Sequence, residues 1–257
     1  MIHPTVQIDP RAECDENVSI GPFSVIGPDV KIASGCRIGS HVVINGPTEI
    51  GENTAIFSFC SIGEDPQDKK FDPAGESRLV IGKNNTIREY CSINRGTPGG
   101  GGVTALGDDN WIMAYCHIAH DCQVGNHVIF ANNATLAGHV EIHDYAILGG
   151  FTGVHQFCRM GENSFSAISA VIVKDVPPFV IVDGNTARAR AINREGLRRR
   201  GFDSDTISAL KEAFKTIYKK GLTLKEAVDT LESRVGEIRQ VGQFLEFIEQ
   251  SQRGIVR

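Results

Sequence analysis

The sequence predicts an all-β solenoid, a parallel β-helix of hexapeptide repeats, followed by a C-terminal α-helical domain. A large apolar residue recurs at every sixth position from Ile8 to Ile172, with Cys14 and Ser166 as exceptions and with two interruptions. Glycine often follows this residue directly, as at Gly125. An α-helix would need apolar spacings of three and four, whereas short strands separated by corners fit a spacing of six. Each unit is too small to bury its own face, so the units must stack.

The two interruptions of the repeat predict loops near residues 64–78 and 96–103. The second reads GTPGGGGV, and such a glycine run can indicate a phosphate-binding loop. It lacks the Gly-Lys-Ser/Thr ending of that motif and no helical pattern follows, so we expect a flexible loop. The repeat stops at Asp175-Val176-Pro177-Pro178, because prolines interrupt a strand ladder. We therefore place the β-helix in residues 1–185 and the helical domain in residues 186–257.

Three helices are expected in the C-terminal domain. Asp203 or Ser204 can cap a helix that runs to Lys220 and is closed by Gly221, and Thr223 can cap a second helix. Their helically spaced apolar positions are Ile207, Leu210, Phe214, Ile217 and Tyr218 in the first, Leu224, Ala227, Val228, Leu231 and Val235 in the second, and Val241, Phe244, Leu245 and Ile248 in the third. These helices would cover the open end of the solenoid, which otherwise exposes unpaired strand edges.

Composition narrows the class of protein. The chain has 257 residues and a formal net charge of −5, which argues against a general nucleic-acid-binding surface. No run of about 18 apolar residues predicts a transmembrane helix, and the N-terminus lacks the pattern of a signal peptide, so we expect a cytoplasmic protein. None of the seven cysteines forms a CxxC motif. Six stand two residues before a repeat aliphatic and Cys14 occupies a repeat position, which predicts small buried apolar residues.

Six of the eight histidines lie between Cys116 and Phe157, in the most regular part of the repeat. A regular repeat has little need for histidine, so the cluster indicates a site built on the solenoid. A metal site is one alternative, but structural zinc needs a closed set of ligands. Solvated surface histidines are the other, and we expect this for His127 and His143.

Several segments together resemble the acyltransferases that use acyl-carrier protein and UDP-N-acetylglucosamine in lipid A biosynthesis. They are HIAHDCQVGN, ANNATLAGHV, GGFTGVHQF, DVPPFVIVDGN and EGLRRRGF. The resemblance covers essentially the whole chain. It implies a left-handed coil of triangular cross-section, 18 residues per coil, and a homotrimer with sites in clefts between subunits. It also implies no metal or organic cofactor, with the acyl chain delivered as a thioester of acyl-carrier protein.

An 18-residue coil places residues 18 apart on adjacent coils, about 4.8 Å apart. His120, Gly138 and Gln156 then form one column, and Asp121 lies beside His139. A neutral imidazole can accept a proton from a hydroxyl near neutral pH, and an adjacent carboxylate can fix its tautomer. The resemblance implies the same roles: His120 as general base, Asp121 as its partner, and Gly138 as the oxyanion N–H donor.

The resemblance also implies a set of substrate-binding residues. His117, His139, His155 and Gln156 would line the cleft, and Asp68 and Lys70 would hold the sugar nucleotide. The residues implied for the nucleotide and its phosphates are Asn193, Glu195, Arg199 and Arg200. Ile168 stands where some members have glycine and would set acyl-chain length, and Asn94 replaces a histidine of close relatives.

Other classes of function stay open from the sequence. One is another hexapeptide-repeat acyltransferase, either an N-acyltransferase or an acetyl-CoA-dependent enzyme; the N-acyltransferases carry an additional N-terminal domain, for which a repeat beginning by Ile8 leaves no room. Another is a non-catalytic solenoid that only binds. The arginines that follow the repeat form either a solvated helix face or a surface that attracts diphosphate and an acidic carrier protein; they are Arg188, Arg190, Arg194, Arg198, Arg199 and Arg200.

Overall fold

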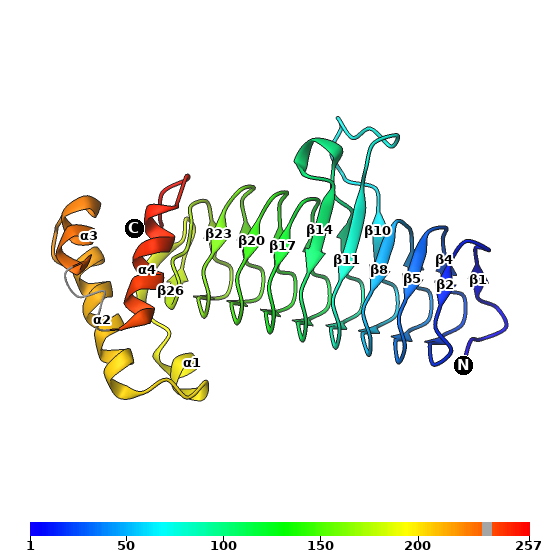
Figure 1. Ribbon diagram of the computed structural model, residues 1–257, viewed down its shortest axis with the longest axis horizontal. Helices are drawn as coiled ribbons and strands as arrows, with labels where there is room; N and C mark the ends of the chain where they lie inside the picture. The colour runs from blue at the N-terminus through cyan, green and yellow to red at the C-terminus, as the bar shows by residue number, and fades with distance from the viewer. Residues whose placement is uncertain (233–237) are drawn as a thin grey trace.

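Figure 1 shows a computed structural model of the chain, in which residues 1–232 and 238–257 are described. The strands wind into a long parallel solenoid, and the helices gather at its C-terminal end. None of the helices in these described ranges is long and apolar enough to cross a membrane.

The solenoid has three faces, and the chain visits them in a fixed order. The first sheet contains β1 (Gln7–Ile8), β4 (Val25–Ile26), β7 (Val43–Ile44), β10 (Ser61–Glu64), β13 (Ser92–Asn94), β16 (His117–Ile118), β19 (Thr135–Leu136), β22 (Gly153–Val154) and β25 (Val171–Ile172). The second contains β2 (Glu13–Cys14), β5 (Val30–Ile32), β8 (Thr48–Ile50), β11 (Arg78–Ile81), β14 (Val103–Leu106), β17 (Gln123–Val124), β20 (Glu141–Ile142) and β23 (Arg159–Met160).

The third sheet contains β3 (Ser19–Ile20), β6 (Arg37–Ile38), β9 (Ala55–Ile56), β12 (Thr86–Ile87), β15 (Trp111–Ile112), β18 (Ile129–Phe130), β21 (Ile147–Leu148), β24 (Phe165–Ser166), β26 (Val180–Asp183) and β27 (Arg188–Ile192). Three edges join the faces: the first–second edge, the second–third edge and the third–first edge. Register confirms the 18-residue coil, because His117 pairs with Thr135 and Thr135 pairs with Gly153.

The repeat residues fill the interior of the solenoid. The inward position of nearly every strand is a buried aliphatic, such as Ile118 or Leu136. The thiol of Cys116 donates to the carbonyl of Ala131 on the next coil at 3.3 Å, and that of Cys122 to Ala137 at 3.1 Å. Six of the seven cysteines are buried and Cys14 is half-buried, which confirms their prediction as small core residues.

Strand pairing continues beyond the two prolines, although the sequence predicts that the ladder stops there. β26 pairs in parallel with β24, and β27 folds back antiparallel to β26. The prolines interrupt the ladder only locally, because the residues from Val180 onward carry N–H groups and have an open edge to join. A division at residue 185 falls in the turn of this hairpin.

Helices α1 (Arg194–Arg199), α2 (Ser204–Tyr218), α3 (Leu224–Glu232) and α4 (Arg239–Glu249) follow. Asp203 caps α2, since its carboxylate accepts the Thr206 N–H at 2.7 Å. Thr223 and Glu226 form a reciprocal capping box at α3. The expected apolar positions of these helices are buried or half-buried; Val235 lies outside the described residues.

The C-terminal segment is tied to the last coil through Asp175. This carboxylate is 1% exposed and accepts the Arg159 N–H at 2.9 Å and the Ser251 hydroxyl at 2.6 Å. The backbone of Val256 also donates to the Asp175 carbonyl at 2.9 Å. The segment after α4 therefore covers the end of the second sheet, close to the histidine cluster.

Candidate active site

His120 lies directly on the backbone of Gly138 on the next coil. A Cβ atom built on Gly138 would fall 2.5 Å from His120 Cε1 and 2.7 Å from Nε2, so only glycine admits the ring in this position. Among the described residues, the Gly138 N–H has no hydrogen-bond acceptor. The column expected from the 18-residue period is therefore present in the structure.

His120 and Asp121 form a hydrogen-bonded dyad on the first–second edge. The distance from His120 Nδ1 to Asp121 Oδ2 is 2.8 Å, and the exposed fractions of the two side chains are 18% and 1%. An ionised carboxylate only accepts hydrogen bonds, so it holds the proton on Nδ1 and leaves the lone pair on Nε2. Nε2 has no hydrogen-bond partner among the described residues and is thus available to accept a proton from a bound hydroxyl.

His139 completes the cluster from the next coil. Its Nε2 is 3.7 Å from Asp121 Oδ2, and its ring stacks on Phe157 with centroids 4.4 Å apart. His120, Asp121 and His139 have ligand atoms close enough together for a metal ion. Asp121 Oδ2, however, already accepts from His120 and from the Thr97 hydroxyl at 2.7 Å, and a metal would have to replace both hydrogen bonds. These hydrogen bonds favour a His120–Asp121 dyad over a closed metal site.

His117 points outward from β16 on the first sheet. Its Nδ1 lies 2.7 Å from the Ser92 hydroxyl. Burial, and secondarily the neighbouring His120, lowers the pKa of His117 below its ordinary value. His117 is consequently a neutral ring near pH 7, suited to hydrogen bonding. Downstream on the same edge, His155 and Gln156 are exposed.

A cavity of about 930 Å³ opens beside Asp121 and His139. It extends along the second sheet to the end of α4 and the C-terminal segment. Its lining residues are Gly100, Asp121, Gln123, His139, Glu141, Phe157, Arg159, Asp175, Gln250, Gln252 and Arg253. This is a largely polar space with the dyad carboxylate at one end and two arginines among its walls.

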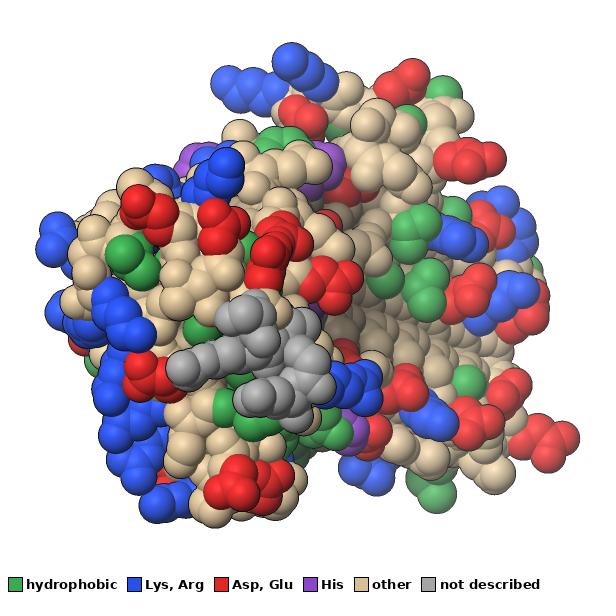
Figure 2. Space-filling model, turned by 60° about the vertical axis from the view of Figure 1, so that its left-hand side comes forward, with side chains coloured by type: hydrophobic (Ala, Val, Ile, Leu, Met, Phe, Trp, Pro, Cys, Tyr) green, Lys and Arg blue, Asp and Glu red, His purple; other side chains and the backbone are tan. Residues whose placement is uncertain are grey.

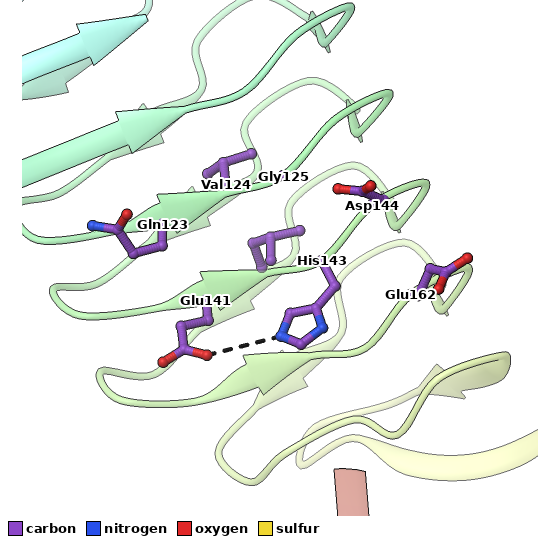
Figure 3. Close-up of a pocket in the computed structure, with 8 residues that line it drawn as sticks. Gln123, Val124, Gly125, Glu141, His143, Asp144 and Glu162 are labelled. Carbon is purple, nitrogen blue, oxygen red and sulfur yellow. Dashed lines mark ion pairs between the residues drawn. The ribbon is translucent and has the colours of Figure 1, made fainter. Parts of the chain in front are cut away.

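Figure 3 shows a different cavity, about 580 Å³ in volume, farther across the second sheet. Glu141 pairs there with His143 at 3.8 Å, while Asp144 and Glu162 stand on the side toward the second–third edge. Burial, and then Asp144, raises the pKa of Glu162. The cavity contains no member of the dyad, so we assign it no part in the chemistry.

The residues expected to bind the nucleotide lie around α1, on the second–third edge. Asn193 caps α1 and donates to the Asn163 carbonyl at 3.0 Å, and Glu195 pairs with Arg199 at 3.0 Å. The guanidinium of Arg200 lies over the Tyr145 ring at 4.7 Å. The structure thus brings these residues together with one another, but on a different edge from the dyad.

Of two further groups of expected residues, Asp68 and Lys70 lie on the same first–second edge as the dyad, and Ile168 lies on another edge. Asp68 and Lys70 occupy the loop 65–77, where Asp68 Oδ1 accepts the Lys70 N–H at 2.9 Å. This loop packs on segment 95–102, because the Ser77 hydroxyl donates to the Gly96 carbonyl at 2.6 Å. Ile168 is 70% exposed on the third–first edge. The expected residues of one chain are therefore divided among all three edges.

Segment 95–102 contributes Thr97 and Gly100 to the site, which the sequence does not indicate. The glycine run predicts a flexible loop, whereas the structure packs it as a turn against Asp121, with Thr97 donating to both carboxylate oxygens. The feature of the sequence that could have indicated this role is the position of the segment in the chain. It leaves the coil directly after β13, on the same edge of the first sheet as the dyad.

Comparison with known proteins identifies the family. The family model described as UDP-N-acetylglucosamine O-acyltransferase, domain 2, matches residues 175–256, and the bacterial transferase hexapeptide model matches residues 12–46 and 104–138. An acyl-[acyl-carrier-protein]–UDP-N-acetylglucosamine O-acyltransferase of a Janthinobacterium strain is 54% identical over 100% of this chain and 99% of its own length.

The chain belongs to the UDP-N-acetylglucosamine O-acyltransferase family. Among solved structures, the LpxA protein of Acinetobacter baumannii superimposes with a TM-score of 0.97 at 47% identity, covering 100% of this chain and 99% of that one. The UDP-N-acetylglucosamine acyltransferase of Francisella novicida also gives 0.97, at 42% identity, over 100% and 94% of the two chains. The predicted fold class, a left-handed β-helix with a C-terminal helical domain, is confirmed.

Proposed function

We propose that this acyltransferase moves an (R)-3-hydroxyacyl chain from acyl-carrier protein to the 3-hydroxyl of UDP-N-acetylglucosamine, the first step of lipid A biosynthesis. The observation that carries the proposal is the His120–Asp121 dyad with its open Nε2 above Gly138. The names of full-length relatives supply the donor and acceptor. Their O-acyltransferase names favour this function over the N-acyl and acetyl-CoA alternatives.

The dyad geometry suits general-base transfer without a covalent intermediate. His120 Nε2 would remove the proton of the acceptor hydroxyl while its oxygen attacks the thioester carbonyl. The Gly138 N–H would stabilise the resulting oxyanion. Collapse of the tetrahedral intermediate would break the C–S bond, and the imidazolium would return its proton to the departing thiolate. The thiol of Cys122, the residue that follows Asp121, is no nucleophile, because burial raises its pKa to about 12.

The same proposal includes a homotrimer without metal or organic cofactor. Residues that must meet one substrate are divided among three edges of a prism, and edges of different copies can meet around a threefold axis. An exposed column of stacked rings on the third–first edge supports such an interface. It consists of Phe23, His41, Phe59, Tyr90 and Tyr115, with successive centroids 4.9 to 5.1 Å apart.

We expect the purified protein to have three times the chain mass of 27.9 kDa in light scattering. Replacing Phe59 and Tyr90 together by glutamate should release smaller species, because charge would be buried at the interface. A wild-type protein that stays monomeric at assay concentration would contradict the trimer. A cytoplasmic location is the corresponding proposal for the cell; the seven free thiols are compatible with a reducing compartment.

The test of function is thiol release from (R)-3-hydroxyacyl-carrier protein in the presence of UDP-N-acetylglucosamine. We expect His120→Ala to lower kcat by about 10²–10⁴-fold with the fold intact, as is typical for loss of a general base. His3→Ala is the matched control, because His3 is exposed and precedes β1, the first strand of the solenoid. Near-normal turnover by His120→Ala would rule out its assignment, and a wild-type protein without acceptor-dependent thiol release would rule out the function.

A further inference from the structure

The segment between β13 and β14 closes over the carboxylate of the dyad. Thr97 is 7% exposed and donates twice to Asp121, from its backbone N–H to Oδ1 at 2.9 Å and from its hydroxyl to Oδ2 at 2.7 Å. On the other side, the Asp121 N–H donates to the Thr104 hydroxyl at 2.8 Å. Together with His120 Nδ1, these contacts give the buried carboxylate three donors and one fixed orientation.

The turn itself is firmly anchored to the solenoid. The Thr97 carbonyl accepts the N–H groups of Gly100 and Gly102, both at 2.9 Å. Preceding it, the Arg95 guanidinium donates to the carbonyls of Gly46 and Gly63 at 2.6 and 2.9 Å. Thr97 is therefore held by the coil on one side and by its own turn on the other, and does not depend on substrate for its position.

Close approach of this turn requires glycine at one position. A Cβ atom on Gly100 would fall 2.2 Å from Asp121 Oδ2 and 2.6 Å from His139 Cε1, whereas one on Gly99 would meet nothing within 4 Å. The neighbouring glycines of the run thus face different surroundings. Of these two, Gly100 leaves room for the dyad and lines the cavity beside it.

A buried carboxylate is stable only when its oxygens accept hydrogen bonds, and the positions of the donors fix its orientation. If Oδ2 rotated away from His120, the imidazole would lose the partner that keeps its proton on Nδ1. Nε2 would then carry the proton in part of the molecules and could not act as a base. Since Thr97 provides two of the three donors, it controls this orientation through the carboxylate.

We propose that Thr97 is a positioning residue for the His120 general base and that Gly100 provides the space for it. The inference rests on the proposed function and deepens it. These two residues of the glycine-rich segment 95–102 thereby form a fixed support of the dyad. Thr97 donates to the carboxylate from this segment, and His120 donates to it from the coil.

The test compares Thr97→Val with Thr97→Ser. Valine keeps the shape and the backbone donor but removes the hydroxyl, so kcat should fall about ten- to a hundredfold, the loss expected for a hydrogen bond to a charged group. KM for both substrates should stay within about twofold, because the Thr97 side chain is buried against Asp121. Serine restores the donor and should restore kcat. Wild-type kcat in Thr97→Val, or a serine variant as impaired as valine, would overturn the proposal.

Gly100→Ala and Gly99→Ala form a matched pair on the same turn. We expect Gly100→Ala to lower kcat with little change in KM, and Gly99→Ala to retain wild-type turnover. Equal losses in both would mean that the turn is merely sensitive to any side chain, which would overturn the role of Gly100. Circular dichroism and thermal unfolding of each variant check that the fold persists.

A readout independent of turnover separates this inference from the proposed function. In protein labelled with ¹⁵N-histidine, NMR reports the tautomer of His120, which we expect to be Nδ1–H in the wild type and mixed in Thr97→Val. If the wild-type protein shows no acyl transfer, the proposed function is wrong, but the tautomer of His120 can still be measured and compared. Identical His120 spectra in the two proteins would remove the role of Thr97.

Discussion

At the scale of single residues, the site is built from corner positions with left-handed backbone. Asp121, His139 and Phe157 have φ values of 60°, 61° and 63° and lie on three successive coils of one edge. Aspartate and histidine tolerate this conformation better than most residues, and ring stacking offsets part of its cost at Phe157. The corners therefore place a carboxylate, an imidazole and a supporting ring at the spacing of the coils.

One consequence at this scale is a pH-dependent stability carried by His117. Burial lowers its folded pKa below the unfolded value near 6.5, so the unfolded chain binds more protons as pH falls. Its stabilising contribution is complete above about pH 6.5 and is lost as pH falls through the folded pKa. We expect the urea midpoint to fall between pH 7.5 and 5.5, and to fall less in His117→Asn. An equal fall in both proteins would assign the effect to other groups.

At the scale of elements, periodicity explains what the sequence can predict. A fixed step of six residues defines the core, and the 18-residue coil that the family resemblance implies defines the columns. The proximity of His120 to Gly138 follows from these two together. Segment 95–102 lies outside the repeat, and no period says where a loop returns, so its contact with Asp121 cannot be predicted in this way. The β26–β27 hairpin is also not predicted, because two prolines suggest an end of pairing, whereas β26 still pairs with β24.

The arginines after the repeat lie in β27 and α1, except Arg200, which is the C-cap residue of α1. Arg199 pairs with Glu195 and Arg190 with Asp183, while Arg188, Arg194 and Arg198 have no ion pair among the described residues. Figure 2 shows Lys and Arg side chains gathered along one side of the helical end. In a chain with net charge −5, this end presents a local positive surface.

This surface predicts a salt-dependent KM for the carrier protein. The range of electrostatic attraction shrinks from about 30 Å at 0.01 M salt to about 8 Å at 0.15 M, so KM should rise with ionic strength. Arg194→Gln with Arg198→Gln should flatten the dependence, whereas Arg37→Gln on β6 serves as a control from the other half of the solenoid. A KM that is flat across this salt range in the wild type would contradict electrostatic attraction.

At the scale of the whole molecule, the division of expected residues among three edges becomes an argument about acyl-chain length. Ile168 lies on the third–first edge and His120 on the first–second edge, with the first sheet between them. An acyl chain that starts at the dyad can reach such a residue across the outer face of that sheet or on a neighbouring copy. Ile168 is largely exposed in one chain, so a pocket around it would need a neighbouring copy to supply the opposite wall.

We therefore expect Ile168 to limit the acyl chain. Each buried methylene contributes about 0.8 kcal/mol, while forcing extra ones into a filled pocket costs roughly 1–3 kcal/mol, so the isoleucine should favour shorter hydroxyacyl donors than glycine-bearing relatives use. Ile168→Gly should shift preference toward longer chains with little change in KM for UDP-N-acetylglucosamine. Ser169→Gly, next to it and also exposed with φ of 59°, is the control. If wild type and Ile168→Gly rank a series of acyl donors identically, the chain ends elsewhere.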